Sequence, residues 1–295
     1  MPEGPEIARE ADRIRAAISG RQALAVRFAF PALQRRAPGF TGERVDFVRP
    51  RGKALLIGFS NGLTIYSHNQ LYGRWRVTRP GVMPETRRQL RLAIESEDRW
   101  ALLYSASEIE ILDEAALGLH PYLSRLGPDA LDPALDVATL VERLADRRFL
   151  RRRLAALLLD QSFVAGLGNY LRSEICFEAR LDPALRPLDL EAASRVRLAR
   201  ALLRLPRRAY RLCGVTLPDA RARALRAGGE SWRRARHWVF ARAGAPCRRC
   251  ETKIERLELA GRRLYVCRAC QPASPRRPGG QARAGSGPST GAAVD

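Results

Sequence analysis

Four cysteines near the C-terminal end of the chain constrain its folding more than any other feature. They follow a Cys-x2-Cys-x16-Cys-x2-Cys spacing and are Cys247, Cys250, Cys267 and Cys270. Each Cys-x2-Cys pair can place two thiolates on one metal ion, and four thiolates complete the tetrahedral shell that zinc prefers. The residues between the pairs suffice for a hairpin. The spacing therefore predicts a zinc-finger hairpin around one structural zinc ion, a closed site with no open position for chemistry.

Two disulfides are the alternative use of these cysteines. The N-terminus is polar and lacks the apolar region of a secretory signal, and two further cysteines, Cys176 and Cys213, have no evident partner. Both observations favour a reducing cytoplasm, where disulfides are rare. We therefore expect zinc, and a cytoplasmic protein.

The charge of the chain predicts a polyanionic partner. The net charge is +21 over 295 residues, and an excess of this size most often serves nucleic-acid binding. Binding to a membrane surface is the weaker alternative, because the basic residues are not confined to one amphipathic helix. No apolar run approaches the roughly 18 residues that a membrane span needs. We expect a nucleic acid as the partner, and no membrane.

Lysine is rare among the basic residues. Of the 52 lysines and arginines, only Lys53 and Lys253 are lysine. An arginine cannot release its proton near neutral pH, whereas a lysine amine can. Lys53 is therefore a candidate for proton chemistry. The alternative is that a lysine stands there by chance, and chance is a sufficient explanation for Lys253.

The residue pattern divides the chain into a β-rich part and a helical part. A helix is predicted over Pro5–Ile18 by apolar spacing, followed by short strands as far as about Leu112. Asn61-Gly62 is a hairpin-turn signal. After a turn-rich boundary near Gly127–Pro133, helices are predicted over 137–145, 151–160, 169–177 and 191–204. The class is α+β, with an N-terminal β-sandwich or flattened barrel and flanking helices, and a C-terminal helical domain.

The predicted boundaries are 2–127 for the β-sandwich, 128–236 for the helical domain, 237–271 for the finger and 272–295 for a tail. The stretch 220–236 is dense in arginine and poor in large apolar residues, which favours a mobile or solvated segment. The tail consists of proline, glycine, serine, alanine and arginine and cannot form a core, so we expect disorder there.

The hairpin turn predicts that Lys53 and Gln70 lie together at its open end. The loop from His68 to Gly73 would then sit beside the Lys53 amine, and its Leu71 and Tyr72 could wedge into a base stack. Burial of these two side chains in the core is the alternative.

Two further segments could bind phosphate. Gly166 to Asn169 precedes a helix, and with Asn169 as the N-cap its exposed N–H groups could bind an anion, although an ordinary helical turn is favoured on local pattern alone. Arg262 lies in the predicted turn at the tip of the finger hairpin, where it could reach a phosphate or a flipped base. A solvated arginine is the alternative.

The N-terminus offers a nucleophile. Without Met1 the chain begins with Pro2, a secondary amine, and an ordinary α-amine has a pKa near ~8. Such an amine can attack an aldehyde-like carbon and form an iminium, with Glu3 beside it as general acid. Helix capping by Glu3 and Glu6 is the alternative and explains both residues adequately.

These features together resemble one family, that of formamidopyrimidine-DNA glycosylase and endonuclease VIII. The resemblance covers nearly all of the chain up to Gln271 and rests on four segments: Met1 to Glu6, Arg51-Gly52-Lys53, Leu167 to Tyr170 and the four-cysteine finger. The run from Tyr66 to Gly73 is similar to the endonuclease VIII branch. The branch that acts on oxidised purines typically has a His-Leu-Gly-Met-type loop there.

The resemblance implies a bifunctional DNA glycosylase and AP lyase of base excision repair, acting as a monomer on oxidised pyrimidines in damaged double-stranded DNA. Its partner is then DNA, and it associates with the nucleoid through that DNA. Pro2 is then the nucleophile that forms a Schiff base with C1′ of the sugar, and Glu3 is the acid that protonates the sugar oxygen. Lys53 donates a proton in β-elimination and contacts phosphate, and Arg262 assists δ-elimination. The choice of Arg262 over Arg263 rests on its position five residues before Cys267.

The resemblance also implies DNA contacts. Gln70, Leu71 and Tyr72 fill the gap left by the flipped base, Asn169 binds phosphate from a helix-two-turn-helix motif, and Arg125 is a further contact. Two alternatives stay open: preference for oxidised purines, and a non-catalytic zinc-ribbon binder. The intact set of Pro2, Glu3 and Lys53 disfavours the binder.

Overall fold

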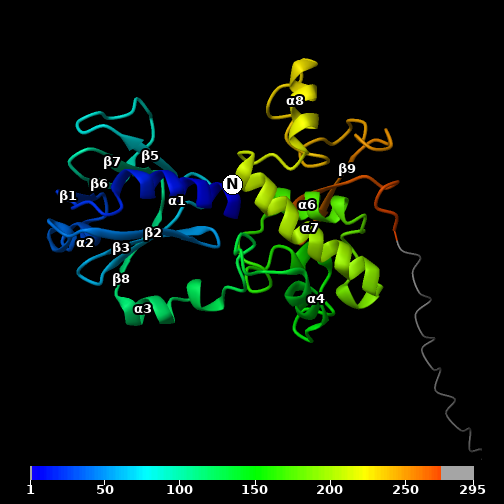
Figure 1. The fold of residues 1–295 in the computed structure, drawn as a ribbon, viewed down its shortest axis with the longest axis horizontal. Helices are drawn as coiled ribbons and strands as arrows, with labels where there is room; N and C mark the ends of the chain where they lie inside the picture. The colour runs from blue at the N-terminus through cyan, green and yellow to red at the C-terminus, as the bar shows by residue number, and fades with distance from the viewer. Residues whose placement is uncertain (1, 274–295) are drawn as a thin grey trace, which may run out of the picture.

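The computed structural model describes residues 2–273, so most of the predicted tail, 274–295, lies outside the described residues. The chain forms a β-rich half and a helical half that lie side by side, with the start of helix α1 between them (Figure 1). In the described residues, no helix has the length and apolar character of a membrane span.

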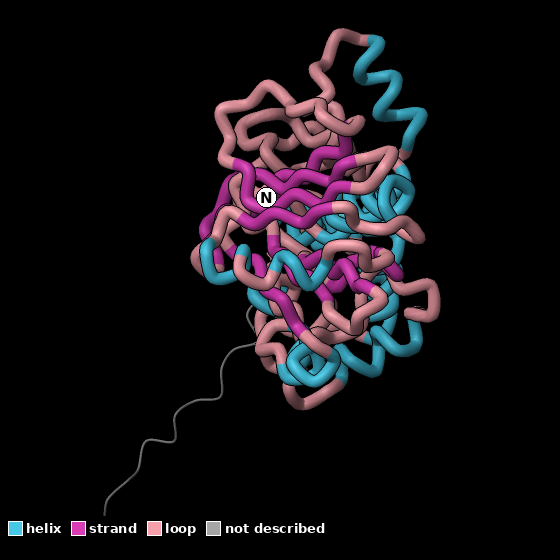
Figure 2. Tube along the Cα trace, turned by 90° about the vertical axis from the view of Figure 1, so that its left-hand side faces the viewer, coloured by secondary structure: helices cyan, strands magenta, loops and turns pink. Residues whose placement is uncertain are grey.

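The β-rich half is a sandwich of two antiparallel four-stranded sheets, which confirms the predicted class (Figure 2). One sheet has the order β2-β3-β4-β8 and the other β1-β6-β7-β5. Their bounds are β1 Ala25–Phe28, β2 Val45–Arg51, β3 Ala54–Phe59, β4 Thr64–His68, β5 Arg74–Thr78, β6 Leu90–Glu95, β7 Trp100–Tyr104 and β8 Glu108–Leu112. Helix α1, Gly4–Ile18, places its predicted apolar face, including Ile7, Ala11 and Ile14, in the shared core. The sandwich thus holds α1 from Ile7 to its end at Ile18.

The β3–β4 hairpin has the predicted turn and register. Asn61 and Gly62 form the turn, where Gly62 has a φ of +80°, and Ala54 pairs with His68 at the open end. Lys53 and the loop after β4 therefore start from adjacent positions, as the hairpin geometry predicts.

Short helices flank the sandwich and longer ones build the helical half. They are α2 Pro31–Gln34, α3 Glu114–Leu119, α4 Val137–Ala145, α5 Leu154–Leu157, α6 Asn169–Glu178, α7 Ala192–Arg211 and α8 Asp219–Ala227, with short 3₁₀ turns at Ala37–Phe40, Leu123–Arg125 and Pro187–Asp189. Residues of α4 to α7 share one apolar core. The finger hairpin consists of β9, Glu255–Leu259, and β10, Arg262–Val266.

Three predicted elements differ from the structure. The helix predicted over 151–160 is only the four-residue α5, because Arg153 is extended and the N–H groups of Leu154 and Ala155 donate to carbonyls of the 183–185 loop. Helix α7 continues past the predicted end to Arg211, because its apolar face continues through Leu205 and Ala209.

The third difference lies in the arginine-dense stretch. Its first half forms helix α8, where the composition predicted a mobile or solvated segment, and Ala222 packs against the finger core. The arginines of α8 are exposed, so only the solvation of their side chains matches the prediction. Helix α8 projects from the helical half in Figure 1.

Two glycine backbones meet where the halves join. The Gly4 N–H donates to the Gly166 carbonyl at 2.7 Å, and a Cβ at position 4 would lie 2.8 Å from the Gly166 Cα. No side chain fits at this distance, so the start of α1 can approach the segment before α6 only through glycine.

We expect Gly4→Ala to destabilise the protein by about 1–3 kcal/mol, because the added methyl group must push two backbones apart. The midpoint of thermal unfolding should fall by roughly 3–10 °C. Gly118→Ala is the matched control: it lies in α3 and its Cβ would meet no atom within 4 Å. An unchanged midpoint for Gly4→Ala would contradict the described junction.

Candidate active site

The Glu3 carboxylate lies at the N-terminus of helix α6. Oε1 accepts a hydrogen bond from the Tyr170 N–H at 2.7 Å and Oε2 one from the Leu171 N–H at 3.3 Å. The side chain is buried, with Glu3 only 3% exposed. A Cβ at Gly168 would lie 2.4 Å from the Glu3 Cδ, so glycine is required there too. The N–H groups that the sequence offered to a phosphate are thus occupied by a carboxylate of this chain.

The position of the Glu3 carboxylate also excludes the predicted N-cap of α6. The N-cap of α6 is Gly168, and Asn169 is the first helical residue. The cap prediction for Asn169 is wrong because the Glu3 carboxylate already binds the first N–H groups of the helix, which an N-cap side chain would otherwise bind.

Burial raises the pKa of Glu3 to about 7, the Lys53 ammonium opposes this shift, and the neighbouring Glu6 adds to it. Near neutral pH the carboxyl group can therefore donate or accept a proton, which is the property of a general acid–base group. Helix capping and acid chemistry are compatible readings of the same residue.

Glu6 supports this arrangement from one turn further along α1. Its Oε2 accepts a hydrogen bond from the Glu3 N–H at 2.9 Å, and its Oε1 one from the Tyr170 hydroxyl at 3.1 Å. Burial raises the pKa of Glu6. Pro2 precedes Glu3, is half-buried and lines the same cleft.

Lys53 is placed by a turn that both halves hold. The Gly52 N–H donates to Asp129 Oδ2 at 3.0 Å, and the Lys53 N–H donates to the Tyr122 hydroxyl at 2.9 Å. Burial lowers the pKa of the Lys53 amine, while the charge of Glu3 raises it and that of Arg262 lowers it. Lys53 thus interacts with both of the other charged candidates. Lys253 lies exposed on the finger, in keeping with chance.

Arg172 is a central residue that sequence reasoning missed. It is fully buried on α6, and its guanidinium donates to Asn169 Oδ1 at 2.7 Å and to the carbonyls of Ala155 at 2.8 Å, Arg263 at 3.0 Å, Leu259 at 3.2 Å and Arg262 at 3.3 Å. Because the chain is rich in arginine, nothing in the sequence distinguishes Arg172. It connects α5, the start of α6 and the finger hairpin.

Arg262 begins strand β10 rather than lying in the turn. It pairs with Leu259, and the turn itself is Ala260-Gly261, where both residues have positive φ. Its side chain is exposed at the tip of the hairpin and lines the cleft.

The loop from His68 to Gly73, here called the wedge loop, projects its apolar side chains outward. Leu71 is 58% and Tyr72 67% exposed, so the reading that buries them in the core is wrong. Gln70 adopts a φ of +47°, and its Nε2 donates to Glu108 Oε2 at 2.8 Å. Exposed apolar side chains on a fixed turn are suited to entering a base stack.

A cleft of about 940 Å³ joins most of these groups, but Lys53, Gln70 and Tyr72 are not among the residues that line it. Pro2, Glu3, Leu71, Asn169 and Arg262 all line it. Its basic residues are Arg9, Arg13, Arg74, Arg233, Arg236, Arg262 and Arg263. A cavity of this size can take a nucleotide, and its arginines attract phosphate. Arg125 is exposed on a 3₁₀ turn and lies outside this lining.

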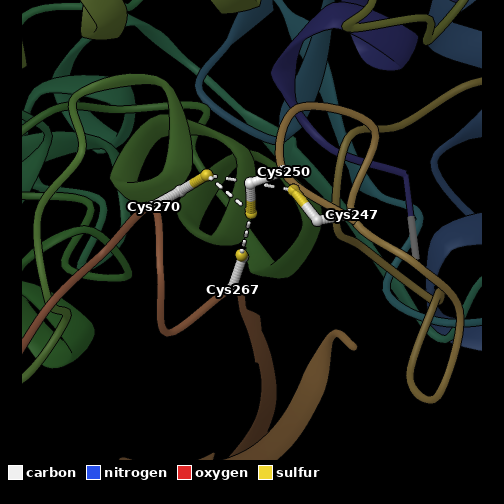
Figure 3. A group of neighbouring side chains, drawn as sticks. All are labelled: Cys247, Cys250, Cys267 and Cys270. Atoms are coloured by element: carbon white, nitrogen blue, oxygen red, sulfur yellow. Dashed lines mark hydrogen bonds between the residues drawn. The ribbon is translucent and has the colours of Figure 1, made fainter. Parts of the chain in front are cut away.

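The four cysteines converge as their spacing predicts (Figure 3). Their sulfur atoms lie within 4.8 Å of one another, and three Sγ pairs are 3.4, 3.5 and 3.9 Å apart. A tetrahedral site with Zn–S bonds of about 2.3 Å separates sulfurs by about 3.8 Å, so the residues fit zinc. The finger therefore holds one structural zinc ion, which fixes the base of the hairpin that carries Arg262.

Three family models match the chain. The formamidopyrimidine-DNA glycosylase N-terminal domain matches residues 1–107, the formamidopyrimidine-DNA glycosylase H2TH domain matches 126–218, and a zinc finger found in FPG and IleRS matches 244–273. Together they cover most of the chain.

The chain is similar to curated relatives over their whole length. It is 48% identical over 271 residues to Endonuclease 8 of Escherichia coli O17:K52:H18 and to Endonuclease 8 of Shigella sonnei, covering 92% of this chain and 100% of each relative.

Among solved structures, MutM in complex with DNA containing carbocyclic 8-oxo-G matches with a TM-score of 0.76 at 21% identity, and Lactococcus lactis Fpg with DNA containing an abasic site matches with 0.76 at 20%. Both matches cover 92% of this chain and 100% of the other, and they concern the fold.

We expect Arg172→Lys to lower affinity for duplex DNA by about tenfold, because a lysine amine cannot replace a fork that donates to five acceptors. Zinc content should stay at one ion, since the cysteines are untouched. Fluorescence anisotropy with a labelled duplex and metal analysis measure the two. Arg200→Lys, on the exposed face of α7, is the matched control. Loss of zinc in Arg172→Lys would instead mean that the finger has unfolded.

Proposed function

The chain belongs to the formamidopyrimidine-DNA glycosylase and endonuclease VIII family of base excision repair, and on that basis we propose that it excises oxidised pyrimidines through a Pro2 Schiff base and cleaves the strand by β,δ-elimination. Members of this family are DNA glycosylases with AP lyase activity, so the chain is an enzyme of both kinds. The proposal concerns the lesion class and the residues.

One observation carries the assignment of roles. A carboxyl group directly after Pro2 is buried at a helix N-terminus, and its pKa is raised to about 7. A structural cap on the surface would have an ordinary or lowered pKa. A group that is partly protonated near neutral pH, next to an amine and inside a basic cleft, suits acid catalysis at a sugar.

The first chemical step uses Pro2 and Glu3. Once Met1 has been removed, the lone pair of the Pro2 amine forms a bond to C1′, and the damaged base leaves with the electrons of the glycosidic bond and takes up the proton that the amine loses. Glu3 donates its proton to the ring oxygen O4′ as the C1′–O4′ bond breaks, which leaves an iminium at C1′. The covalent intermediate divides one difficult substitution into two easier steps.

Elimination follows from the iminium. Water takes a proton from C2′ as the C3′–O3′ bond breaks and the 3′ phosphate leaves. A second proton, lost from C4′ to water, breaks the C5′–O5′ bond and expels the 5′ phosphate. Lys53, whose amine has a lowered pKa from burial, supplies a proton and contacts phosphate. Arg262, held by the zinc finger at the edge of the cleft, assists the second elimination.

The remaining site residues bind the duplex. Leu71 and Tyr72, together with Gln70, fill the space that the flipped base leaves. Asn169 lines the cleft, and its Oδ1 accepts a hydrogen bond from Arg172. This bond orients the side chain so that its amide NH₂ binds phosphate. Arg125, exposed away from the cleft lining, contacts the flanking backbone.

We propose the domain division 2–127, 128–236 and 237–271, with one chain acting as a monomer on damaged double-stranded DNA. The hydrogen bonds of Gly52 and Lys53 to residues 129 and 122 support a junction near the first boundary. The matched family segments are compatible with this division.

The lesion class rests on two supports. The wedge loop carries the residues of the endonuclease VIII branch, and the curated relatives at 48% identity bear that name. Oxidised purines are the competing class, and the experiment below distinguishes them.

We expect borohydride to trap the protein on a duplex that carries one thymine glycol, with the adduct on Pro2. Reduction converts the iminium to a stable amine, and N-terminal peptide mapping locates it. A duplex with 8-oxoguanine is the comparison and should trap less.

Trapping only on 8-oxoguanine would reverse the lesion class. Trapping only on an abasic site would support the lyase activity but contradict the proposed class of damaged base. Absence of any adduct, from zinc-loaded protein that binds DNA, would favour a non-catalytic binder.

Glu3→Gln should lower base excision by about 10² to 10⁴-fold, the range of one general acid, while binding of a lesion duplex persists. In the wild type, excision should decline as pH rises above about 7, because the acid is then ionised. Single-turnover excision of thymine glycol and anisotropy on an abasic analogue measure both. Excision at the wild-type rate by Glu3→Gln would show that another group is the acid.

A further inference from the structure

Glu10 is a partly buried carboxylate that the proposed chemistry does not use. It lies on α1 two turns beyond Glu3, lines the same cleft, and its side chain is only 15% exposed. Its Oε2 accepts a hydrogen bond of 2.6 Å from Asn69 Nδ2, and Asn69 is itself 3% exposed. Helix α1 therefore contacts the base of the wedge loop directly.

Asn69 is the residue on which the wedge loop closes. Its carbonyl accepts a hydrogen bond of 2.7 Å from the Gly73 N–H, which joins the two ends of the loop. A Cβ at Gly73 would lie 2.6 Å from the Asn69 Cα, so the ends are in close contact. A shift of Asn69 would thus move the whole loop.

The tip of the loop has little packing to hold it. Leu71 and Tyr72 are both more than half exposed. Besides the polar contacts of Gln70, a further brace is the Arg88 guanidinium, which donates to the Tyr72 carbonyl at 2.6 Å. Arg88 is exposed, whereas the bond between Glu10 and Asn69 is partly buried, and a hydrogen bond with less access to water is the stronger constraint.

We propose that Glu10 is a positioning residue that fixes the wedge loop through Asn69, so that one helix sets the places of the wedge and of the catalytic pair Pro2 and Glu3. This inference rests on the proposed function. It assigns Glu10 no contact with substrate. If Glu10 has this role, helix α1 fixes both the position at which the wedge enters the base stack and the position of C1′ at the Pro2 amine.

The charge of Glu10 adds a dependence on pH. Burial raises the pKa of Glu10 to about 7; the Asn69 bond and the charges of Arg13 and Arg74 lower it, and Glu6 raises it. An ionised carboxylate is a stronger acceptor than a neutral carboxyl group. The hold on Asn69 is therefore firm above about pH 7 and weaker below it.

The test separates wedge placement from chemistry. Glu10→Ala, Glu10→Gln and Asn69→Ala are compared with the wild type, and Glu142→Ala, an exposed glutamate on α4, is the matched control. Wedge insertion is followed by the fluorescence of 2-aminopurine opposite a tetrahydrofuran abasic analogue in a duplex. Chemistry is followed by excision of thymine glycol from a duplex and by lyase cleavage of an abasic site in single-stranded DNA.

We expect Glu10→Ala to lower duplex excision by about tenfold, the effect of one lost hydrogen bond to a charged group, and to reduce the 2-aminopurine signal. Single-strand lyase activity should stay within about twofold, because no stack is entered. Asn69→Ala should behave alike, and the double variant should be no worse than either single one. Glu10→Gln should restore most of the signal, since its amide oxygen still accepts from Asn69.

The pH profile gives a second readout. The ratio of the wild-type signal to the Glu10→Gln signal should rise between about pH 6 and 8, because only the wild type ionises at this position. The fluorescence measurement needs no chemistry, so it decides the role of Glu10 even if the lesion assignment fails.

Three outcomes would overturn the proposal. They are an unchanged 2-aminopurine signal in Glu10→Ala, an equal loss of duplex excision and single-strand lyase activity, and additive losses in the double variant. The second would point to a general role in folding, which the thermal midpoint of each variant would reveal.

Discussion

The placement of the Glu3 carboxylate at the start of α6 is the contact on which the site depends. It joins the β-rich half to the helical half, and it exists only because glycine at positions 4, 166 and 168 lets the two backbones approach. A negative charge is favoured at a helix N-terminus, although by only about 0.3–1 kcal/mol at an exposed site. Burial opposes the charge more strongly, and the balance leaves a carboxyl group with a pKa of about 7.

The other parts of the site are arranged around this contact. Lys53 lies near enough to influence the pKa of Glu3 and is itself held by groups of both halves. Arg172 connects α6 to the finger hairpin by hydrogen bonds to the carbonyls of Leu259 and Arg263. The four cysteines fix the base of that hairpin. In the proposed mechanism, the zinc ion therefore acts on the chemistry only through the position of Arg262. A buried ionisable group with a shifted pKa, supported by the fold around it, is typical of catalytic positions.

The sequence predicts the parts of this protein that depend on local spacing. The finger follows from the cysteines, and the neighbourhood of Lys53 and the wedge loop follows from the turn at Asn61-Gly62. The contacts between distant segments were not predictable. Nothing near Asn169 indicates that Glu3 caps its helix, and nothing near Glu10 indicates a bond to Asn69. The helix expected over 151–160 failed for the same reason, since carbonyls from residues 183 and 185 bind its first N–H groups.

The cleft contains both arginines, which attract phosphate, and carboxyl groups, which repel it when ionised. Its seven arginines attract phosphate, while Glu3, Glu6 and Glu10 lie along one helix in the same lining. Like charges disfavour each other, so a phosphate that enters the cleft beside Glu3 favours the neutral form of that carboxyl group. In the proposed mechanism, the neutral form of Glu3 is the proton donor for ring opening. Substrate binding and the protonation of the acid thus favour one another, and the arginines make possible the approach of an anion that the carboxylates alone would repel.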